Sequence, residues 1–394
     1  MRLQDALSIG DLERLAQKRL PRVLFECIGS GVEDEQGVVR NETAFHKHQL
    51  LARHLVDVSK RDQSTTIFGR TYASPFGISP MGIAEIFRRG ADSMLAEAAA
   101  AAKVPSIMSG SCMTPPETIA QVSGGNAWFQ LYAARDPNIS DDFVRRAREA
   151  GYGTMVLTVD NPVFPKMERD KRNGFSVPFH LTVPLVIDAL THPRWTGEWL
   201  RNGGLPMMRT WQPYASAGAT PSEVALFRRS QNPSVQTWRD VERFRRLWPG
   251  KFVIKGLARA SDAVRAADAG VDGVIVSNHG GKTLDRAPAT VDALVAIAAA
   301  VGDRMTVMLD SGVRRGSDVI VGLCLGARFV FVGRAALYGV TVGGVSGARK
   351  ALDILREEVD MTMALIGCRS VAELGPDFLF ENQGQIHNQA IAAE

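Results

Sequence analysis

Residues 274–286 read V-I-V-S-N-H-G-G-K-T-L-D-R, and this stretch decides the fold. It begins with β-branched apolar residues, which are typical of a strand buried on both faces, as in a parallel sheet. The chain then turns polar and ends in His279 and the pair Gly280-Gly281, which allows a sharp turn or a close approach to a ligand. In α/β barrels, acids and bases stand at the carboxyl ends of strands. His279 is therefore a candidate base, although a single loop histidine is more often a simple hydrogen-bonding residue.

The rest of the chain repeats this alternation of strand and helix patterns. Eight short apolar runs predict strands at 76–79, 106–108, 128–132, 154–160, 252–255, 271–278, 305–310 and 329–333. Helix-like segments lie between several of them, at 93–102, 140–150, 261–269, 291–301 and 318–325. This order predicts an α/β fold, the (β/α)8 TIM barrel, whose strand exits converge on one mouth. An open doubly wound sheet is the alternative architecture.

Two segments do not follow this alternation of strands and helices. Residues 1–68 predict an N-terminal helical cap, with one amphipathic helix over 11–20 and another that starts at Pro21. Residues 176–234 follow the fourth predicted strand and are far longer than an ordinary connection. Their apolar aromatic residues predict a partly mobile lid insertion over the mouth, whereas the aromatic and basic mixture could instead rest on a membrane surface. We expect one domain over residues 1–394.

Composition excludes several classes of protein. Lys plus Arg at 46 against Asp plus Glu at 42 gives a net charge of +4, which is too small and dispersed for a nucleic-acid partner and better suited to a small anionic ligand. The four cysteines are far apart and predict neither a disulfide framework nor a metal site. The start of the chain has no signal-peptide pattern, and no apolar run reaches the roughly 20 residues of a spanning helix. These absences favour a cytoplasmic protein.

Polar residues follow all of the predicted strands. The strand ends carry Pro80-Met81-Gly82, Ser109, Gln130, Tyr132, Thr158, Asp160, Lys255, Ser277, His279, Asp310, Gly312, Arg314, Gly333 and Arg334. Gln130, Thr158 and Ser109 are neutral hydrogen-bonding residues suited to the edge of a flat heterocycle. The glycines and arginines after the last two strands lie where barrels often bind phosphate.

A second group of strand-end residues suits acid–base chemistry. His279 and Asp160 supply a base and a carboxylate that could orient it. Each residue also has a simpler interpretation: Asp310 and Arg334 could pair with each other at the rim, and Tyr132 could serve packing only.

Five motifs together resemble the FMN-dependent α-hydroxy-acid oxidases and dehydrogenases. They are S-N-H-G-G-K-T-L-D (277–285), D-S-G-V-R-R-G-S-D (310–318), F-Q-L-Y (129–132), L-T-V-D (157–160) and V-G-R (332–334), and the resemblance extends over about 12–368.

The resemblance implies a barrel that binds FMN. The flavin would have Pro80, Met81 and Gly82 behind it, Ser109, Gln130 and Thr158 along its edge, Lys255 near N1 and O2, and Ser277 among the cofactor contacts. The phosphate would lie on Asp310, Gly312, Arg314, Gly333 and Arg334. His279 would remove a substrate proton, Asp160 would stabilise the imidazolium, and Tyr132 would contact the substrate.

The chain departs from the resemblance at the substrate carboxylate. In that family a tyrosine and two arginines hold this group, and the corresponding residues here are Cys27, Met167 and Lys282. A charge-assisted hydrogen bond contributes roughly 1.5–3 kcal/mol, so losing the tyrosine and one arginine should weaken a small carboxylate by about 3–6 kcal/mol. Lys282 keeps a positive charge but not the two-pronged guanidinium fork.

Several interpretations therefore stay open. Either Lys166, Arg169 or an insertion residue restores the clamp for a bulkier 2-hydroxy acid, or the substrate is a peptide-derived or amine compound without a simple 2-hydroxy carboxylate. A Schiff-base aldolase that uses Lys255 and a flavin-binding protein without turnover are the alternatives from other classes. The electron acceptor would be oxygen, a quinone or another protein, and the resemblance favours a homotetramer.

Overall fold

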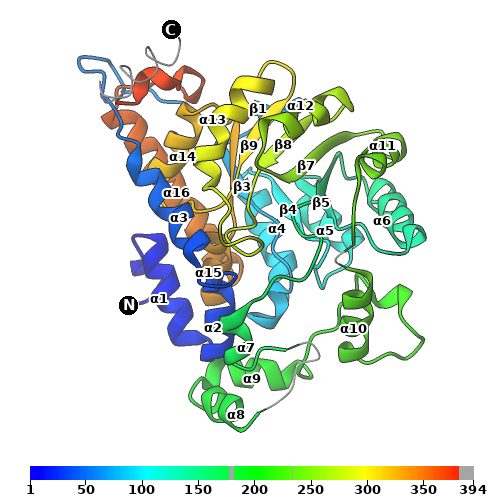
Figure 1. Cartoon of the computed structure of the whole chain (residues 1–394). Coiled ribbons are helices and arrows are strands. Elements are labelled where there is room, and N and C mark those ends of the chain that lie inside the picture. The colour runs from blue at the N-terminus through cyan, green and yellow to red at the C-terminus, as the bar shows by residue number, and fades with distance from the viewer. Residues whose placement is uncertain (177–181, 233, 381–394) are drawn as a thin grey trace.

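The computed structural model describes residues 1–176, 182–232 and 234–380, and in this part of the chain eight parallel strands close into a barrel (Figure 1). The strands are β3 (Phe76–Ile78), β4 (Ser106–Met108), β5 (Ala127–Leu131), β6 (Thr154–Thr158), β7 (Lys251–Leu257), β8 (Gly273–Val276), β9 (Thr306–Leu309) and β10 (Phe329–Val332). β10 pairs with β3 and completes the ring. The predicted barrel is thus confirmed, and the open-sheet alternative is wrong.

Helices surround the barrel (Figure 1). They are α4 (Ala91–Ala101), α5 (Pro116–Ser123), α6 (Pro137–Glu149), α11 (Trp238–Leu247), α12 (Ala260–Asp268), α13 (Thr290–Val301), α14 (Gly316–Cys324), α15 (Arg334–Gly343) and α16 (Val345–Leu365). All five helix-like segments of the sequence match helices in this set. The pair α15 and α16 was not predicted, because glycines hide it: a Cβ on Gly339 would lie 2.4 Å from the backbone oxygen of Gly347, so these glycines allow close helix contact at the expense of helix propensity.

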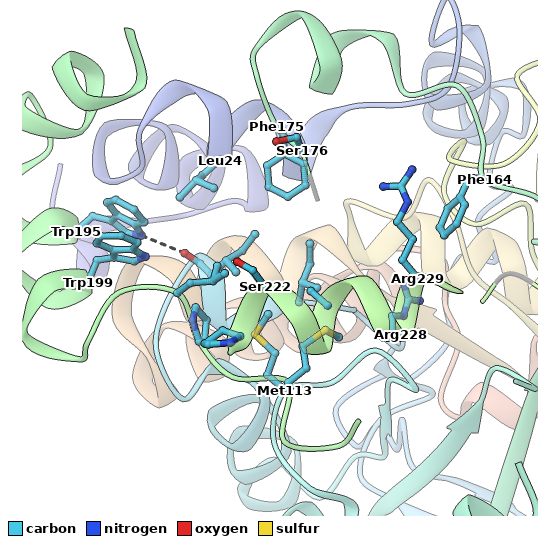
Figure 2. A pocket seen from close by; sticks show the side chains of 17 residues that line it. Leu24, Met113, Phe164, Phe175, Ser176, Trp195, Trp199, Ser222, Arg228 and Arg229 are labelled. Carbon is cyan, nitrogen blue, oxygen red and sulfur yellow. Dashed lines mark hydrogen bonds between the residues drawn. The ribbon is translucent and has the colours of Figure 1, made fainter. Parts of the chain in front are cut away.

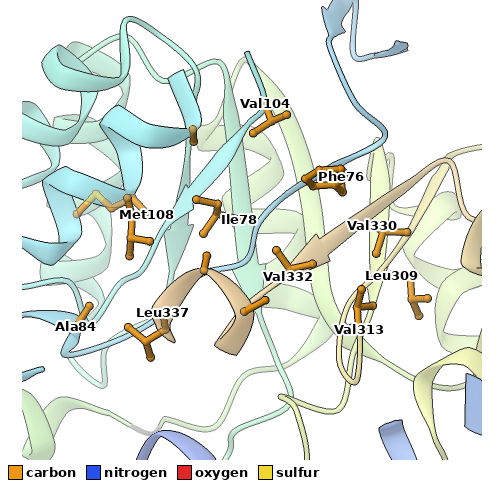
Figure 3. Packing of buried hydrophobic residues seen from close by; sticks show 14 of the residues in the cluster. Phe76, Ile78, Ala84, Val104, Met108, Leu309, Val313, Val330, Val332 and Leu337 are labelled. Atoms are coloured by element: carbon orange, nitrogen blue, oxygen red, sulfur yellow. The ribbon is translucent and has the colours of Figure 1, made fainter. Parts of the chain in front are cut away.

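Two hydrophobic layers hold the strands. Because side chains alternate along a strand, one set fills the barrel and the other faces the helices. The interior set comprises Ile107, Trp128, Val156, Val253, Ile275, Met308, Phe329 and Phe331. The outer set includes Ile78 of β3 and Val332 of β10, which belong to the same cluster as Leu337 of α15 (Figure 3).

A hairpin closes the amino-terminal end of the barrel. Its strands are β1 (Thr65–Ile67) and β2 (Arg70–Tyr72), and Ile67, Phe68 and Tyr72 pack against the interior set. The ring of Phe68 lies 5.6 Å from that of Trp128, at the start of β5. Side chains thus fill the barrel interior at this end, and the opposite end carries the polar strand exits.

The amino-terminal segment packs along the barrel. It contains α1 (Ile9–Arg19), α2 (Arg22–Gly29) and α3 (Gln36–Ala44), and α1 and α2 match the predicted helices. Ser8 and Asp11 cap α1 reciprocally. α2 places Cys27 and Ile28 at the barrel mouth.

The long insertion lies between β6 and α11. α7 (Glu168–Arg172) precedes the predicted insertion at 176–234, which contains α8 (Val183–Leu190), α9 (Pro193–Arg201) and α10 (Pro221–Gln231). Residues 177–181 and 233 lie outside the described residues. Two buried tryptophans anchor the insertion: Trp195 donates to the backbone oxygen of Ile86 at 3.2 Å, and Trp211 to that of Gly110 at 2.9 Å. The insertion is therefore fastened to the loops after β3 and β4, and its motion as a lid stays a prediction.

Candidate active site

The alternation that fills the barrel also builds its mouth. On each strand, the residue two positions beyond an interior residue points toward the barrel axis one layer higher. Those residues are Ser79, Ser109, Gln130, Thr158, Lys255, Ser277, Asp310 and Gly333. All seven side chains are buried. The barrel thus changes from apolar to polar within one layer, and buried polar groups of this kind need partners.

Lys255 and Asp310 form an ion pair at the centre of this layer. Their Nζ and Oδ2 atoms are 3.0 Å apart, Lys255 also donates to Oγ of Ser277 at 2.7 Å, and Ser79 donates to Asp310 at 2.7 Å. Burial acts to lower the pKa of Lys255, but Asp310, Asp160 and Tyr132 together outweigh it and raise that pKa above its ordinary value. Lys255 therefore stays an ammonium ion.

The predicted alternative pairing of Asp310 with Arg334 is wrong. The carboxylate of Asp310 is engaged by Lys255 and Ser79, whereas the guanidinium of Arg334 donates to the backbone oxygens of Ile28, Ser30 and Gly280 at 2.8–2.9 Å. Arg334 thus ties the loop after α2 to the His279 loop.

Neutral hydrogen bonds join β4, β5 and β6 in the same layer. Gln130 donates to Oγ1 of Thr158 at 2.8 Å and accepts from the amide of Gly110 at 2.9 Å. The hydroxyl of Ser109 accepts from the amide of Ser111 at 3.1 Å. These bonds fix the predicted heterocycle-edge residues relative to one another.

One layer higher stand Tyr132, Asp160 and His279, each two residues beyond a member of the polar layer. His279 Nδ1 lies 3.0 Å from Oδ1 of Asp160, and His279 Nε2 lies 3.1 Å from the hydroxyl of Tyr132. Tyr132 is therefore more than a packing residue. Burial, with the charge of Asp160, raises the pKa of Tyr132, so its hydroxyl stays protonated. The carboxylate of Asp160 holds the imidazole through Nδ1 and leaves Nε2 beside Tyr132, an orientation suited to a base.

A cavity of about 950 Å³, including the part open to solvent, lies beside His279. The predicted cofactor residues that line it are Pro80, Met81, Gly82, Lys255, Asp310, Gly312, Arg314, Gly333 and Arg334. His279 also lines it, whereas Ser109, Gln130, Thr158 and Ser277 lie in the buried polar layer beneath. Apolar walls from Ile28, Phe87 and Leu337 and cations near β9 and β10 fit a flat ring system that carries a phosphate.

The three residues at the expected carboxylate-clamp positions differ in where they lie relative to the cavity. Cys27 and Lys282 line this cavity, and Lys282 Nζ donates to the backbone oxygen of Cys27 at 2.9 Å. Burial, with the charge of Arg334, lowers the pKa of Lys282 to about 8, and burial raises that of the Cys27 thiol to about 12. In the described part of the chain, half-buried Met167 lines neither this cavity nor the one described below.

Arg169 and Lys166, which could have replaced the missing arginine of the clamp, form ion pairs with other residues. Arg169 pairs with Glu35, and Lys166 pairs with Glu168 at 2.7 Å. Neither therefore restores the clamp in this conformation.

A second cavity, of about 860 Å³ including the part open to solvent, lies between the insertion and the barrel mouth (Figure 2). Its walls are mostly apolar and include Leu24, Ile86, Met113, Trp195, Trp199, Leu205, Pro206 and Met208. The charged groups on its described walls are Arg228 and Arg229 of α10. Ile83 lines both cavities, so the two spaces adjoin.

Sequence reasoning missed two residues of this region. Gly256 makes room for Asp160, and a glycine inside a strand is a recognised sign of such close approach. Arg228 lies on an insertion helix, and one arginine among many gives no local signal.

Comparisons with known proteins agree with this geometry. A profile described as FMN-dependent dehydrogenase matches residues 16–381. The chain is 36% identical over 381 residues to (S)-mandelate dehydrogenase of Pseudomonas putida, which covers 97% of this chain and 95% of that protein. It is 38% identical over 375 residues to L-lactate dehydrogenase of Caulobacter vibrioides, covering 95% and 97%. A crystal structure of the monotopic membrane protein (S)-mandelate dehydrogenase superposes with a TM-score of 0.91 at 36% identity, covering 96% of this chain and 100% of that chain.

Proposed function

Because the chain belongs to the FMN-dependent dehydrogenase family, we propose that it oxidises a 2-hydroxy acid with a large apolar side chain, with His279 as the base. The predicted family is confirmed, and the chain is an FMN-dependent oxidoreductase that acts on the CH–OH group of 2-hydroxy acids. The observation that carries the assignment of His279 is its position between Asp160 Oδ1 at 3.0 Å and the hydroxyl of Tyr132 at 3.1 Å.

These residues can perform the proton chemistry. When bound, FMN supplies the two-electron acceptor for the oxidation. His279 Nε2 takes one of the two protons that the substrate loses, and Asp160 stabilises the resulting imidazolium. Tyr132 keeps its hydroxyl proton and can donate it in a hydrogen bond to the substrate. Lys255 places a fixed positive charge beside the ring site, where it stabilises added negative charge.

Replacement of His279 by Gln tests the assignment. Turnover of 2-hydroxy-3-phenylpropanoate should fall by about 10²–10⁴-fold, the usual contribution of general acid–base catalysis, while FMN stays bound. His54→Gln is the matched control, because His54 is exposed and outside the mouth. A fully loaded His279→Gln protein with wild-type turnover would exclude His279 as the base.

The Schiff-base aldolase alternative is disfavoured. A lysine forms a Schiff base only as the free amine, and Asp310 keeps Lys255 protonated. A substrate without a carboxylate remains the rival reading for the same flavin chemistry, since Met167 supplies no charge. Comparing an acid with its primary amide separates these two substrate classes.

Peripheral membrane contact through the insertion is part of the proposal. On α8, Val183, Ile187 and Leu190 are 72%, 59% and 69% exposed, and exposed Arg194 and Arg201 follow on α9. Apolar residues beside basic ones suit the surface of an anionic bilayer. A similar solved structure is described as a monotopic membrane protein. Among the described residues, no helix combines the length and apolar character needed to cross a bilayer.

Sedimentation with vesicles that contain phosphatidylglycerol tests this contact. The double substitution Ile187→Glu and Leu190→Glu should release the protein into the supernatant, whereas Met361→Glu, on an exposed position of α16, should not. Equal sedimentation of both variants would contradict the proposal.

Assembly, location and the final electron acceptor complete the proposal. We retain the homotetramer and a cytoplasmic location as expectations from the sequence. Light scattering on the purified protein tests whether it is a tetramer. Among oxygen, a quinone and a protein, membrane contact favours a quinone, because quinones dissolve in the bilayer.

A further inference from the structure

We propose that Arg228, on the insertion helix α10, holds the substrate carboxylate in place of the missing clamp, while the cavity of Figure 2 receives the substrate's apolar side chain. This inference rests on the proposed oxidation of a 2-hydroxy acid. It assigns a substrate-contact role to a residue outside the three expected clamp positions, Cys27, Met167 and Lys282.

Arg228 lies near the layer of Tyr132, Asp160 and His279. Its Nη2 atom donates to Oγ of Ser111 at 2.6 Å. Ser111 lies in the turn that follows β4, where the amide of Cys112 donates to the backbone oxygen of Ser109 at 2.9 Å. A Cβ on Gly110 would lie 3.1 Å from Cδ2 of Tyr132, so the exits of β4 and β5 touch. Arg228 therefore reaches the layer that contains Tyr132 and His279.

The guanidinium of Arg228 has hydrogen-bond donors and a positive charge that no described residue satisfies. Ser111 is its only hydrogen-bond partner among the described residues, and its buried Nε atom has none there. Arg228 forms no ion pair with a carboxylate among the described residues, and burial lowers its pKa. A partly buried cation without a counter-ion is unfavourable unless a ligand supplies the missing charge. A planar carboxylate is the ligand that a guanidinium binds best.

The neighbouring arginine shows the contrast. Arg229 stands beside Arg228 on α10, and its guanidinium lies 4.5 Å above the ring of Phe164 (Figure 2). Arg229 is exposed to solvent, which satisfies the remaining donors. Of the two charged residues on the described cavity wall, Arg228 is thus the one that lacks compensation.

The cavity walls indicate the chemical class of the substrate. The cavity wall is apolar apart from these arginines and a few serines, and the rings of Trp195 and Trp199 stack 5.9 Å apart on one side. About 120 Å³ of this space admits the centre of a water-sized sphere, which is more than a methyl group requires. The shape and lining therefore fit an acid with a large aromatic or branched apolar substituent, whose carboxylate would face Arg228.

The test uses 2-hydroxy-3-phenylpropanoate and its primary amide with the FMN-loaded protein. In Arg228→Met, we expect KM for the acid to rise by about 10- to 100-fold, the effect of losing a charge-assisted hydrogen bond, with little change in KM for the amide. Arg228→Lys should restore part of the loss for the acid. Arg239→Met, at an exposed position of α11, is the matched control and should leave both substrates unaffected.

The outcomes separate the inference from the proposed function. If the wild type oxidises the acid and loaded Arg228→Met shows an unchanged KM, the clamp assignment is wrong while the function stands. An equal rise in KM for acid and amide would also overturn it, since that pattern indicates a packing defect. If the wild type oxidises no 2-hydroxy acid, the proposed function itself fails and the inference falls with it. Measured FMN content and Tm of each variant exclude misfolding, and Arg228→Lys keeps the test valid if the Met variant unfolds.

Discussion

Gly256 leaves the space that Asp160 occupies. A Cβ on Gly256 would lie 2.6 Å from Cβ of Asp160 and 2.7 Å from its Cγ. Gly256 also has a φ of +108°, and the pairing of β7 with β8 shifts register between Lys255 and Leu257. The strand thus bulges at a glycine immediately after Lys255, and the bulge lets the carboxylate of Asp160 reach Nδ1 of His279.

Gly256→Ala should therefore impair catalysis through Asp160. The methyl group must displace the carboxylate, and a displacement of about 1 Å at a catalytic group can reduce kcat by roughly 100-fold. The free energy of unfolding should also fall by about 1–3 kcal/mol, because the site is overpacked. Steady-state kinetics and urea unfolding measure both effects. Gly153→Ala is the control, since a Cβ there would meet nothing within 4 Å; equal behaviour of the two variants would contradict the account.

Asn41 and Asn278 connect the amino-terminal segment to the loop that contains His279. Each buried side-chain amide donates to the other's oxygen, at 2.8 and 2.7 Å. Asn41→Leu would leave Asn278 short of a partner, so we expect a loss of about 1–3 kcal/mol in the free energy of unfolding and a lower kcat, because Asn278 precedes His279. Asn138→Leu, at an exposed position of α6, is the control. Unchanged stability and kcat in Asn41→Leu would show that the pair does not position the loop.

Lys282 should give substrate binding a dependence on pH. Its pKa is lowered to about 8, first by burial and then by the charge of Arg334. Lys282 is therefore protonated below about pH 8 and attracts an anion, and it loses that charge as the pH rises through 8. We expect KM for 2-hydroxy-3-phenylpropanoate to increase between pH 7 and pH 9, with KM for the primary amide nearly constant. Lys282→Met should abolish this dependence; the same slope in that variant would assign it to another group.

Lys255 and Asp310 should depend on each other for stability, so that removing one charge costs more than removing both. Lys255→Met leaves a buried carboxylate unpaired, and breaking such a pair typically lowers the free energy of unfolding by about 3–5 kcal/mol. FMN should bind more weakly, since the positive charge beside the ring site is lost. The double variant Lys255→Met and Asp310→Asn should recover part of the stability but not the FMN affinity. Denaturation and absorbance titration test this, and a single variant as stable as the wild type would contradict it.

Periodicity explains why so much of the barrel could be predicted. Apolar runs such as 329–333 and polar strand ends such as Gln130 and Lys255 are local signals, and two-residue alternation places them in shared layers. The predicted strands ran one or two residues too long at several ends, as at Ser277-Asn278, because the chain leaves the sheet before His279 adopts its positive φ. The hairpin over 65–72 was missed, since its strands are only three residues long.

The site was predictable only where its residues follow strands. His279, Asp160 and Tyr132 carry such signals, and the structure brings them together. Arg228 and Asn41 come from helices more than 100 and about 240 residues away from their partners Ser111 and Asn278, and contacts at that separation depend on the closed fold. The changes at the clamp positions Cys27, Met167 and Lys282 were visible in the sequence, but the ion pair between Arg169 and Glu35 was not.

The central claim is that this barrel binds FMN and uses it to oxidise a 2-hydroxy acid at a site built around His279. An anaerobic titration of the FMN-loaded protein with 2-hydroxy-3-phenylpropanoate, followed by visible absorption, tests it most directly. The flavin bands should bleach as the acid is added, and equally loaded His279→Gln should stay coloured under the same conditions. A protein that takes up no FMN, or one that binds FMN and is bleached by neither this acid nor smaller 2-hydroxy acids, would contradict it.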